Sequence, residues 1–263
     1  MNYPILDYFD DEGLINKDTY IANQAKDFEN LHMVKDNNID TCLLVFIKSK
    51  NMPEDILQKC ERVYTFTAAS KENWVYLYDK KFLIAQVSMG GPAAVGLMEE
   101  LGFLGITKFF ACGSCGLIDH NFDASKLLLL DRAIRDEGTS YHYMPPSVYV
   151  DTDADLTNYV DQALRKRNFN FARGTTWTCD AFFRETPKAI ETRLAQGATS
   201  VEMETASWCA AAKYRGYKFA QVLWFSDAVK QENWKWICDR KILEISVVRL
   251  MMDIIAEYLA DNK

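Results

Sequence analysis

The segment 82-FLIAQVSMGGPAAVGLMEEL-101 predicts the fold class. Its first part, 82–87, is apolar on both faces, as in a strand that is covered by helices on both sides. SMGGPAA at 88–94 then makes a turn, and Pro92 stands in the first turn of the next helix, where its missing N–H does no harm. A strand, a glycine turn and a helix in direct succession are typical of α/β proteins.

The same alternation continues along the chain and predicts one α/β domain. Further strands are predicted at 42–47, 62–68, 74–79, 106–112, 126–134 and 220–226. Helices are predicted at 53–61, 92–104, 154–167, 186–196, 203–215 and 239–260. We therefore expect a single three-layer α/β/α domain over residues 1–263, with a twisted, mostly parallel mixed central sheet. Residues 1–40 are expected to form an N-terminal extension that packs on it.

Composition narrows the class of protein. The 263 residues carry a formal net charge of −7, which disfavours nucleic acid and anionic membranes as partners. No apolar run approaches the roughly 20 residues that span a bilayer, and the acidic start lacks the features of a signal peptide. The seven cysteines are scattered through apolar stretches, which favours free thiols in a reducing cytoplasm. Cys112 and Cys115 form a CxxC without a second ligand pair, so no metal is expected.

Two glycine-rich segments follow predicted strands. In SMGGPAA the backbone can approach a ligand closely, with helix N–H groups facing it, although a tight turn without a ligand is the alternative. In 112-CGSCGL-117 the glycines and the Ser114 hydroxyl predict a nest of donors for an oxyanion or a sugar oxygen. This second segment lies at the carboxyl end of a buried strand, where open α/β sheets bind ligands.

The segment 200-SVEMETASW-208 places two carboxylates in front of small and apolar residues. Glu202 and Glu204 converge only if the chain is extended here and the helix starts just beyond. Glu202 could instead form a capping box with Thr199, and the sequence leaves both roles open. Glu204 has no basic partner at helical spacing, and an unpaired buried carboxylate is costly. A ligand with two adjacent hydroxyls, such as a ribose, would satisfy it.

Asp227 ends the apolar run 220-AQVLWFSD-227. Enzymes of the α/β class present catalytic side chains from this end of a strand. The alternative is that Asp227 caps a following helix.

Together these segments resemble the nucleoside phosphorylase family, the purine nucleoside and uridine phosphorylases, over about residues 40–258. SMGGPAAVGLMEEL resembles the family's Gly-Met-Gly-x-Pro-Ser segment, and FFACGSCGLID resembles its Arg-x-Gly-Ser/Thr-x-Gly strand end. VEMETASWCAAAKYRG resembles the long and specific Val-Glu-Met-Glu signature. WFSDAV resembles the Val-Ser-Asp that closes the base site of the purine enzymes.

The resemblance implies a role for each matching residue. Ribose contacts are implied for Met89, Glu202, Met203 and Glu204, base stacking for Phe182, and phosphate contacts for Gly113 and Ser114. Asp227 would protonate the purine at N7, supported by Arg240 thirteen positions later. A proton donor to the leaving base typically contributes about 10²- to 10⁴-fold in rate. We expect Arg240 to approach Asp227 only when substrate is bound.

The sequence departs from the family at the phosphate site. The family's Gly-Asp-Pro-x-Arg loop is replaced by 46-FIKSKNMPEDIL-57, and Ala111 stands where the family has a second arginine. Two guanidinium groups suited to bidentate phosphate binding are therefore missing. Possible substitutes are Lys48, Lys50, Arg132 and Arg135.

The predicted function is a nucleoside phosphorylase, a pentosyltransferase of purine salvage. It would cleave a purine nucleoside with phosphate into free base and ribose or deoxyribose 1-phosphate. A nucleosidase of the same fold, a uridine phosphorylase and a non-catalytic nucleoside-binding protein are the alternatives. Asp227 favours purine, and the residues with which uridine phosphorylases bind uracil are absent after Phe182, where the chain continues RETPK. No cofactor or metal is implied, phosphate is the co-substrate, and the resemblance implies a homo-oligomer.

Overall fold

The computed structural model describes residues 13–24, 30, 32–68, 71–230 and 233–262. The strands are β1 (Thr41–Val45), β2 (Cys60–Ala68), β3 (Lys71–Tyr78), β4 (Phe82–Gln86), β5 (Lys108–Leu117), β6 (Leu127–Asp136), β7 (Tyr149–Asp151), β8 (Phe171–Cys179), β9 (Ala198–Glu202), β10 (Lys218–Lys230) and β11 (Asn233–Trp236). The α-helices are α1 (Lys17–Gln24), α2 (His32–Asp36), α3 (Glu54–Leu57), α4 (Gly91–Phe103), α5 (Ala154–Lys166), α6 (Pro187–Ala195), α7 (Thr205–Arg215) and α8 (Arg240–Asp261). Short 3-10 turns are η1 (Ser49–Asn51), η2 (Thr139–His142) and η3 (Phe182–Arg184).

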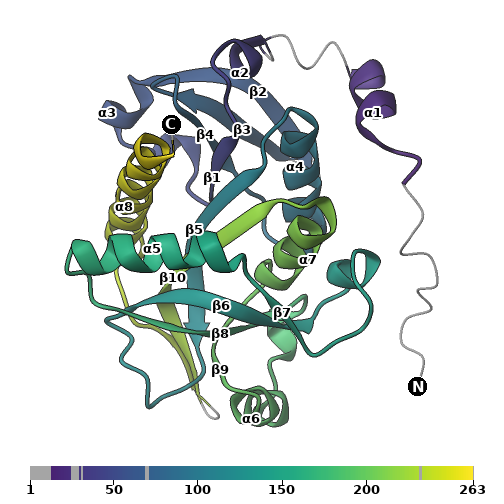
Figure 1. Ribbon diagram of the computed structural model, residues 1–263. Coiled ribbons are helices and arrows are strands. Elements are labelled where there is room, and N and C mark those ends of the chain that lie inside the picture. Colours follow the sequence, from purple (N-terminus) through teal and green to yellow (C-terminus); the bar gives the residue numbers. More distant parts are fainter. Residues whose placement is uncertain (1–12, 25–29, 31, 69–70, 231–232, 263) are drawn as a thin grey trace.

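The apolar strands bury both faces, and helices cover each face (Figure 1). Because side chains alternate along a strand, Cys42 and Leu44 of β1 face one core while Leu43 and Val45 face the other. The first core contains side chains of α4 and α7, and the second contains side chains of α5 and α8. The predicted α/β/α layering is therefore confirmed.

The strand order is β11-β10-β6-β8-β9-β5-β1-β4-β3-β2, and an additional pairing joins β10 to β5. This pairing closes β5, β10, β6, β8 and β9 into a ring, with β1, β4, β3 and β2 as a sheet that extends from it. β6, β8 and β9 are parallel to one another and run against β5 and β10 at both seams of the ring. The described pairings thus mix five parallel with six antiparallel ones, and the sheet is less parallel than expected.

Some elements differ from the sequence-based expectation. The helix predicted at 53–61 is only the short α3, because the chain already enters β2 at Cys60. Four strands were not predicted: β7, β8, β9 and β11. They are short, or they carry polar and small residues such as Arg173 and Gly174 of β8, which is partly exposed on the ring. The other predicted elements occur with ends shifted by a few residues.

The described part of the N-terminal segment contacts α4. The ring of Tyr20 in α1 lies 5.9 Å from that of Phe103, and its hydroxyl donates a hydrogen bond to Glu100. Burial raises the pKa of the Glu100 carboxyl to about 7. Residues 1–12 of the expected extension lie outside the described part.

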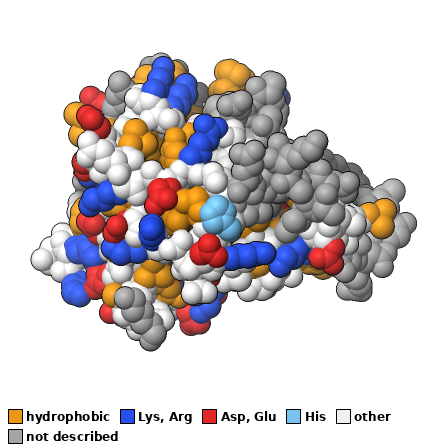
Figure 2. All heavy atoms as spheres, turned by 90° about the horizontal axis from the view of Figure 1, so that it is seen from above, with side chains coloured by type: hydrophobic (Ala, Val, Ile, Leu, Met, Phe, Trp, Pro, Cys, Tyr) orange, Lys and Arg blue, Asp and Glu red, His pale blue; other side chains and the backbone are white. Residues whose placement is uncertain are grey.

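On the face seen from the top of Figure 1, acidic and basic side chains are interspersed with apolar ones (Figure 2). Within the described residues, none of the helices has the length and apolarity that crossing a membrane requires. All seven cysteines are free thiols. Cys112 and Cys115 of the CxxC both lie inside β5 and face different cores.

Candidate active site

The turn between β4 and α4 brings backbone N–H groups to a buried carboxylate. Gly90 has φ +102°, a conformation that favours glycine, and precedes α4. Its N–H donates to Oε1 of Glu204 over 2.6 Å. A Cβ on Gly91 would lie 2.3 Å from Oγ of Ser207, so only glycine lets α4 start this close to α7. Met89 lies beside this contact with 65% of its surface exposed.

The segment between β9 and α7 is built around Glu202. β9 ends at Glu202, the chain bends at Met203 and Glu204, and α7 begins at Thr205. The buried Glu202 carboxylate accepts hydrogen bonds from Thr178 Oγ at 2.6 Å and from the N–H groups of Glu204 and Thr205 at 2.8 and 2.7 Å. The Glu202 side chain therefore caps the start of α7. Thr199 lies within β9, so the alternative of a capping box between Thr199 and Glu202 is wrong.

Glu204 occupies a different environment from Glu202. It is 5% exposed and forms no ion pair among the described residues. Burial, and then the charge of Glu202, raises the pKa of Glu204 to about 8. The charged form is therefore disfavoured in the empty site and becomes favourable when a hydrogen-bond donor arrives.

Replacing Glu202 by alanine should destabilise the fold, because three buried donors lose their acceptor. We expect a loss of roughly 3–5 kcal/mol in the free energy of unfolding, measured by urea denaturation. Glu202→Gln is the matched control, since its amide oxygen can still accept from the two backbone N–H groups. An alanine variant as stable as the glutamine variant would contradict this role.

Asp227 lies at an irregularity of β10. The register with β5 shifts between Phe225 and Asp227, as at a β-bulge, a feature that redirects side chains. Oδ1 of Asp227 accepts from the Ser226 hydroxyl at 2.5 Å, and Oδ2 accepts from the indole N–H of Trp234 at 2.8 Å. Because β10 continues to Lys230, Asp227 does not cap a helix, and that alternative is wrong.

β5 is paired with the strand that precedes Glu204 and with the strand that carries Asp227. Gly116 is paired with Val201 of β9 on one side and with Asp227 of β10 on the other. A Cβ on Gly116 would lie 3.3 Å from Oδ2 of Asp227, so the glycine leaves room for this carboxyl. Burial raises the pKa of the Cys115 thiol, and the charges of Glu202 and Asp227 add to the effect, so both carboxylates lie near Cys115.

Beyond Val201 the chain runs back along β5, because β9 and β5 are antiparallel. The described pairings on this edge of β5 end at Ala111 with β1 and resume at Gly116 with β9. Residues 112–115 therefore have no strand partner on this edge among the described pairings, and the ring of Phe46 lies against Gly113.

The predicted nest at 112–117 is wrong. Gly113 and Ser114 are residues of the regular strand β5, paired with Leu223 and Trp224 of β10. Strand pairing continues through the glycines, so their N–H groups do not converge as in a nest. Among residues 112–115 the half-buried Ser114 is the one that this segment offers to a ligand.

Phe182 begins the turn η3, with its ring 46% exposed and 3.9 Å from that of Phe183. Glu185 follows this turn, where burial, and then the charge of Asp227, raises its pKa to about 7. The structure thus brings the Phe182 segment to the Asp227 side of the site. Glu185 and Trp234 were missed because neither belongs to a motif, although the alternation in WKW at 234–236 is typical of a strand.

A family model described as the phosphorylase superfamily matches residues 51–246. The chain belongs to the phosphorylase superfamily. It is 25% identical over 135 residues to a guanosine phosphorylase of Halorubrum lacusprofundi, covering 51% of this chain and 56% of that protein. It is 24% identical over 121 residues to a uridine phosphorylase of Haemophilus influenzae, covering 45% and 48%. The chain thus spans about half the length of these relatives.

The fold of this superfamily member is also similar to a solved structure. An AMP nucleosidase from Bacteroides thetaiotaomicron superposes with a TM-score of 0.66 at 18% sequence identity, covering 84% of this chain and 90% of that one. The superfamily match begins at residue 51 and so leaves out 46–50, the first half of the loop where the expected phosphate arginine is missing.

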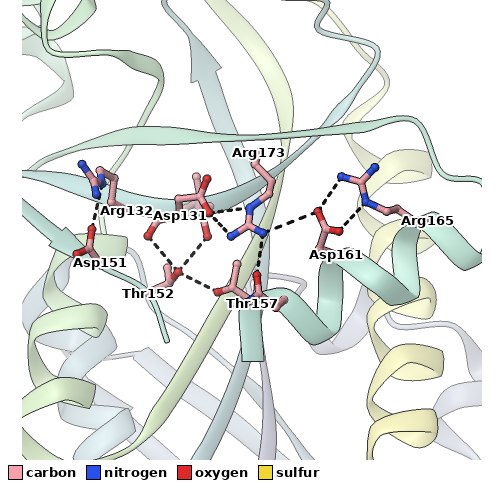
Figure 3. A network of polar contacts seen from close by, with 10 residues as sticks. Asp131, Arg132, Asp151, Thr152, Thr157, Asp161, Arg165 and Arg173 are labelled. Carbon is pink, nitrogen blue, oxygen red and sulfur yellow. Dashed lines mark hydrogen bonds and ion pairs between the residues drawn. The ribbon is translucent and has the colours of Figure 1, made fainter. Parts of the chain in front are cut away.

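Neither arginine proposed as a phosphate ligand is free in this superfamily member. Arg132 pairs with Asp151 in the surface network of Figure 3. Arg135 is buried and holds the segment after η2 through hydrogen bonds to Ser140 Oγ, Met144 O, Pro145 O and Ser147 Oγ. Ala111 is fully buried in the core. Lys48, which precedes η1, and Lys50, which lies within it, are exposed.

Arg240 is the first residue of α8. Its side chain lies outside the described part of the chain, so its support of Asp227 stays a prediction.

Proposed function

We propose that this protein is a nucleoside phosphorylase that cleaves a purine nucleoside with phosphate into free base and ribose 1-phosphate. One observation carries the proposal: Gly116 of β5 is paired both with Val201, three residues before Glu204, and with Asp227, while Glu204 itself accepts a hydrogen bond from the Gly90 N–H. An acid without a cationic partner is suited to a diol, and an acid at a strand bulge is suited to proton donation.

Glu204 would bind the ribose. When the 2′- and 3′-hydroxyls donate to its carboxylate, each charge-assisted hydrogen bond contributes about 1.5–3 kcal/mol. The Gly90 N–H donates a hydrogen bond to Oε1 of Glu204, which fixes the orientation of the carboxylate. Met89 and Met203 supply the surface beside the sugar, while Glu202 acts by holding the start of α7.

Asp227 would protonate N7 of the base while the glycosidic bond breaks and its electron pair moves to N9. Ser226 can serve both states of this acid, since its hydroxyl lies 2.5 Å from Oδ1 of Asp227 and 3.4 Å from the Cys115 carbonyl oxygen. It donates to the carbonyl while Asp227 is protonated and to the carboxylate that forms when the proton is transferred to N7. Phe182 stacks on the base in this proposal, and Arg240 supports the acid.

Phosphate would attack the cationic sugar carbon from the face opposite the base. Gly113 and Ser114 of β5 are the proposed contacts, and Lys48 or Lys50 can add charge. No metal or other cofactor takes part in the proposed reaction. A homo-oligomer, a cytoplasmic location and a role in purine salvage belong to the same proposal.

A second candidate is hydrolysis of the nucleoside by water. Ala111 is buried and Arg135 already donates its hydrogen bonds within the fold, so neither position offers a guanidinium group to phosphate. A site that contains carboxylates and lacks guanidinium groups binds an anion such as phosphate poorly, which favours water as the nucleophile. Uridine phosphorolysis and non-catalytic nucleoside binding are further alternatives.

A product assay separates these functions. Purified protein is incubated with inosine, adenosine, guanosine and uridine, in phosphate and in phosphate-free buffer, and base, ribose and ribose 1-phosphate are quantified. We expect purine release that requires phosphate and yields ribose 1-phosphate. Equal release without phosphate, with free ribose as product, would establish a nucleosidase instead. Saturable binding without any release would establish a binding protein.

A further inference from the structure

The indole nitrogen of Trp234 contacts the carboxyl group of Asp227, the proposed acid. Its indole N–H donates to Oδ2 of Asp227 over 2.8 Å, while 56% of the side chain is exposed. Trp236 follows on the same side of β11, with the two rings in an edge contact at 4.7 Å and 71°. An exposed apolar ring that is anchored by its N–H to a buried strand's carboxylate is an unusual surface feature.

The surroundings favour a flat aromatic ligand at this ring. β11 is the edge strand of the sheet, where exposed apolar side chains invite association. Phe182 and Phe183 form a second exposed aromatic pair, in the turn η3 that precedes Glu185. Exposed aromatic rings around a hydrogen-bonding group are what a nucleobase binds by stacking.

We propose that Trp234 is a residue of the base subsite, whose ring stacks on the purine and whose N–H positions Asp227. This inference rests on the proposed function and extends it to a residue outside every motif in the sequence. Trp234 is a positioning residue toward Asp227 and a binding residue toward the base.

The N–H contact helps the proton transfer for a specific reason. As the Asp227 proton moves to N7 and the glycosidic electron pair to N9, negative charge forms on the Asp227 carboxylate. A donor that already faces Oδ2 strengthens as this charge develops, without reorganisation of water.

Two substitutions separate the two roles. Trp234→Phe keeps a ring and removes the N–H, so we expect kcat to fall about tenfold while KM changes by less than about threefold. Trp234→Leu removes the ring, so KM should rise about 10- to 100-fold. Phe169→Leu, an exposed aromatic residue after α5, is the matched control and should leave both parameters unchanged.

Binding of free hypoxanthine and guanine, measured by calorimetry, tests the inference without turnover. If the wild type binds base but cleaves no nucleoside, the proposed function fails, while weaker binding by Trp234→Leu still supports the base subsite. Base binding and a kcat that stay at wild-type values in both Trp234 variants overturn the inference. Absence of both base binding and cleavage in the wild type overturns both proposals. Thermal melts of each variant establish that the fold is intact.

Discussion

Replacing Asp227 by asparagine should lower kcat on purine nucleosides by about 10²- to 10⁴-fold and leave KM within about threefold. The amide has the shape of the carboxyl group and can still accept from the Trp234 indole, so binding geometry is retained. It has no acidic proton for N7, so the base must leave as an anion. Steady-state kinetics on inosine or guanosine measures the effect.

A substrate with a better leaving group isolates the proton transfer. 4-Nitrophenyl β-ribofuranoside needs no protonation of its leaving group, so Asp227→Asn should cleave it at nearly the wild-type rate. Asp155→Asn, an exposed carboxyl group paired with Lys218, is the matched control and should resemble wild type on both substrates. An equal loss of rate on both substrates would assign Asp227 a structural role.

Replacing Glu204 by glutamine should stabilise the protein at alkaline pH. Burial and the charge of Glu202 raise the pKa of Glu204 to about 8 from its ordinary 4.5. Between these values the folded state holds more protons than the unfolded state, so wild-type stability falls as pH rises toward 8. Glutamine carries no charge, so we expect a gain of about 2–4 kcal/mol at pH 8 to 9 and little change near pH 4.5.

The same substitution should weaken ribose binding. Loss of the carboxylate removes charge-assisted hydrogen bonds to the diol, so KM for ribonucleosides should rise about 10- to 100-fold. The preference for ribonucleosides over 2′-deoxynucleosides should shrink with it. Glu61→Gln, an exposed carboxyl group of β2, is the control for both measurements. A variant whose stability relative to wild type is the same at both pH values would contradict the environment described for Glu204.

The predictable part of the fold is the part whose strands are buried on both faces. Leu43 and Leu44 of β1 face opposite cores, and such continuous apolar runs identify β1, β4 and β5 from sequence. The closure of the ring was not predictable. It depends on β8 and β9, where residues such as Arg173 and Thr199 interrupt any apolar pattern.

The candidate site, like the fold, could be predicted from the sequence only in part. The extended chain expected over 200–204 ends at Glu202, and the helix starts at Thr205 after a bend at Met203 and Glu204. The contact of Glu204 with Gly90 joins two glycine- and acid-bearing segments identified from sequence. The partner that engages Glu202 could not be predicted, because Thr178 lies in the unpredicted strand β8. The nest expected around Ser114 failed because glycines can also be accommodated within a paired strand.

The most direct test is the structure of the protein with a purine C-nucleoside, whose carbon–carbon glycosidic bond cannot be cleaved. The account predicts a single ligand whose 2′- and 3′-hydroxyls lie at hydrogen-bond distance, about 2.5–3.0 Å, from the Glu204 carboxylate. The base of that same ligand should place the nitrogen equivalent to N7 at a similar distance from Asp227. A bound nucleoside that contacts only one of these carboxyl groups, or neither, would contradict the account.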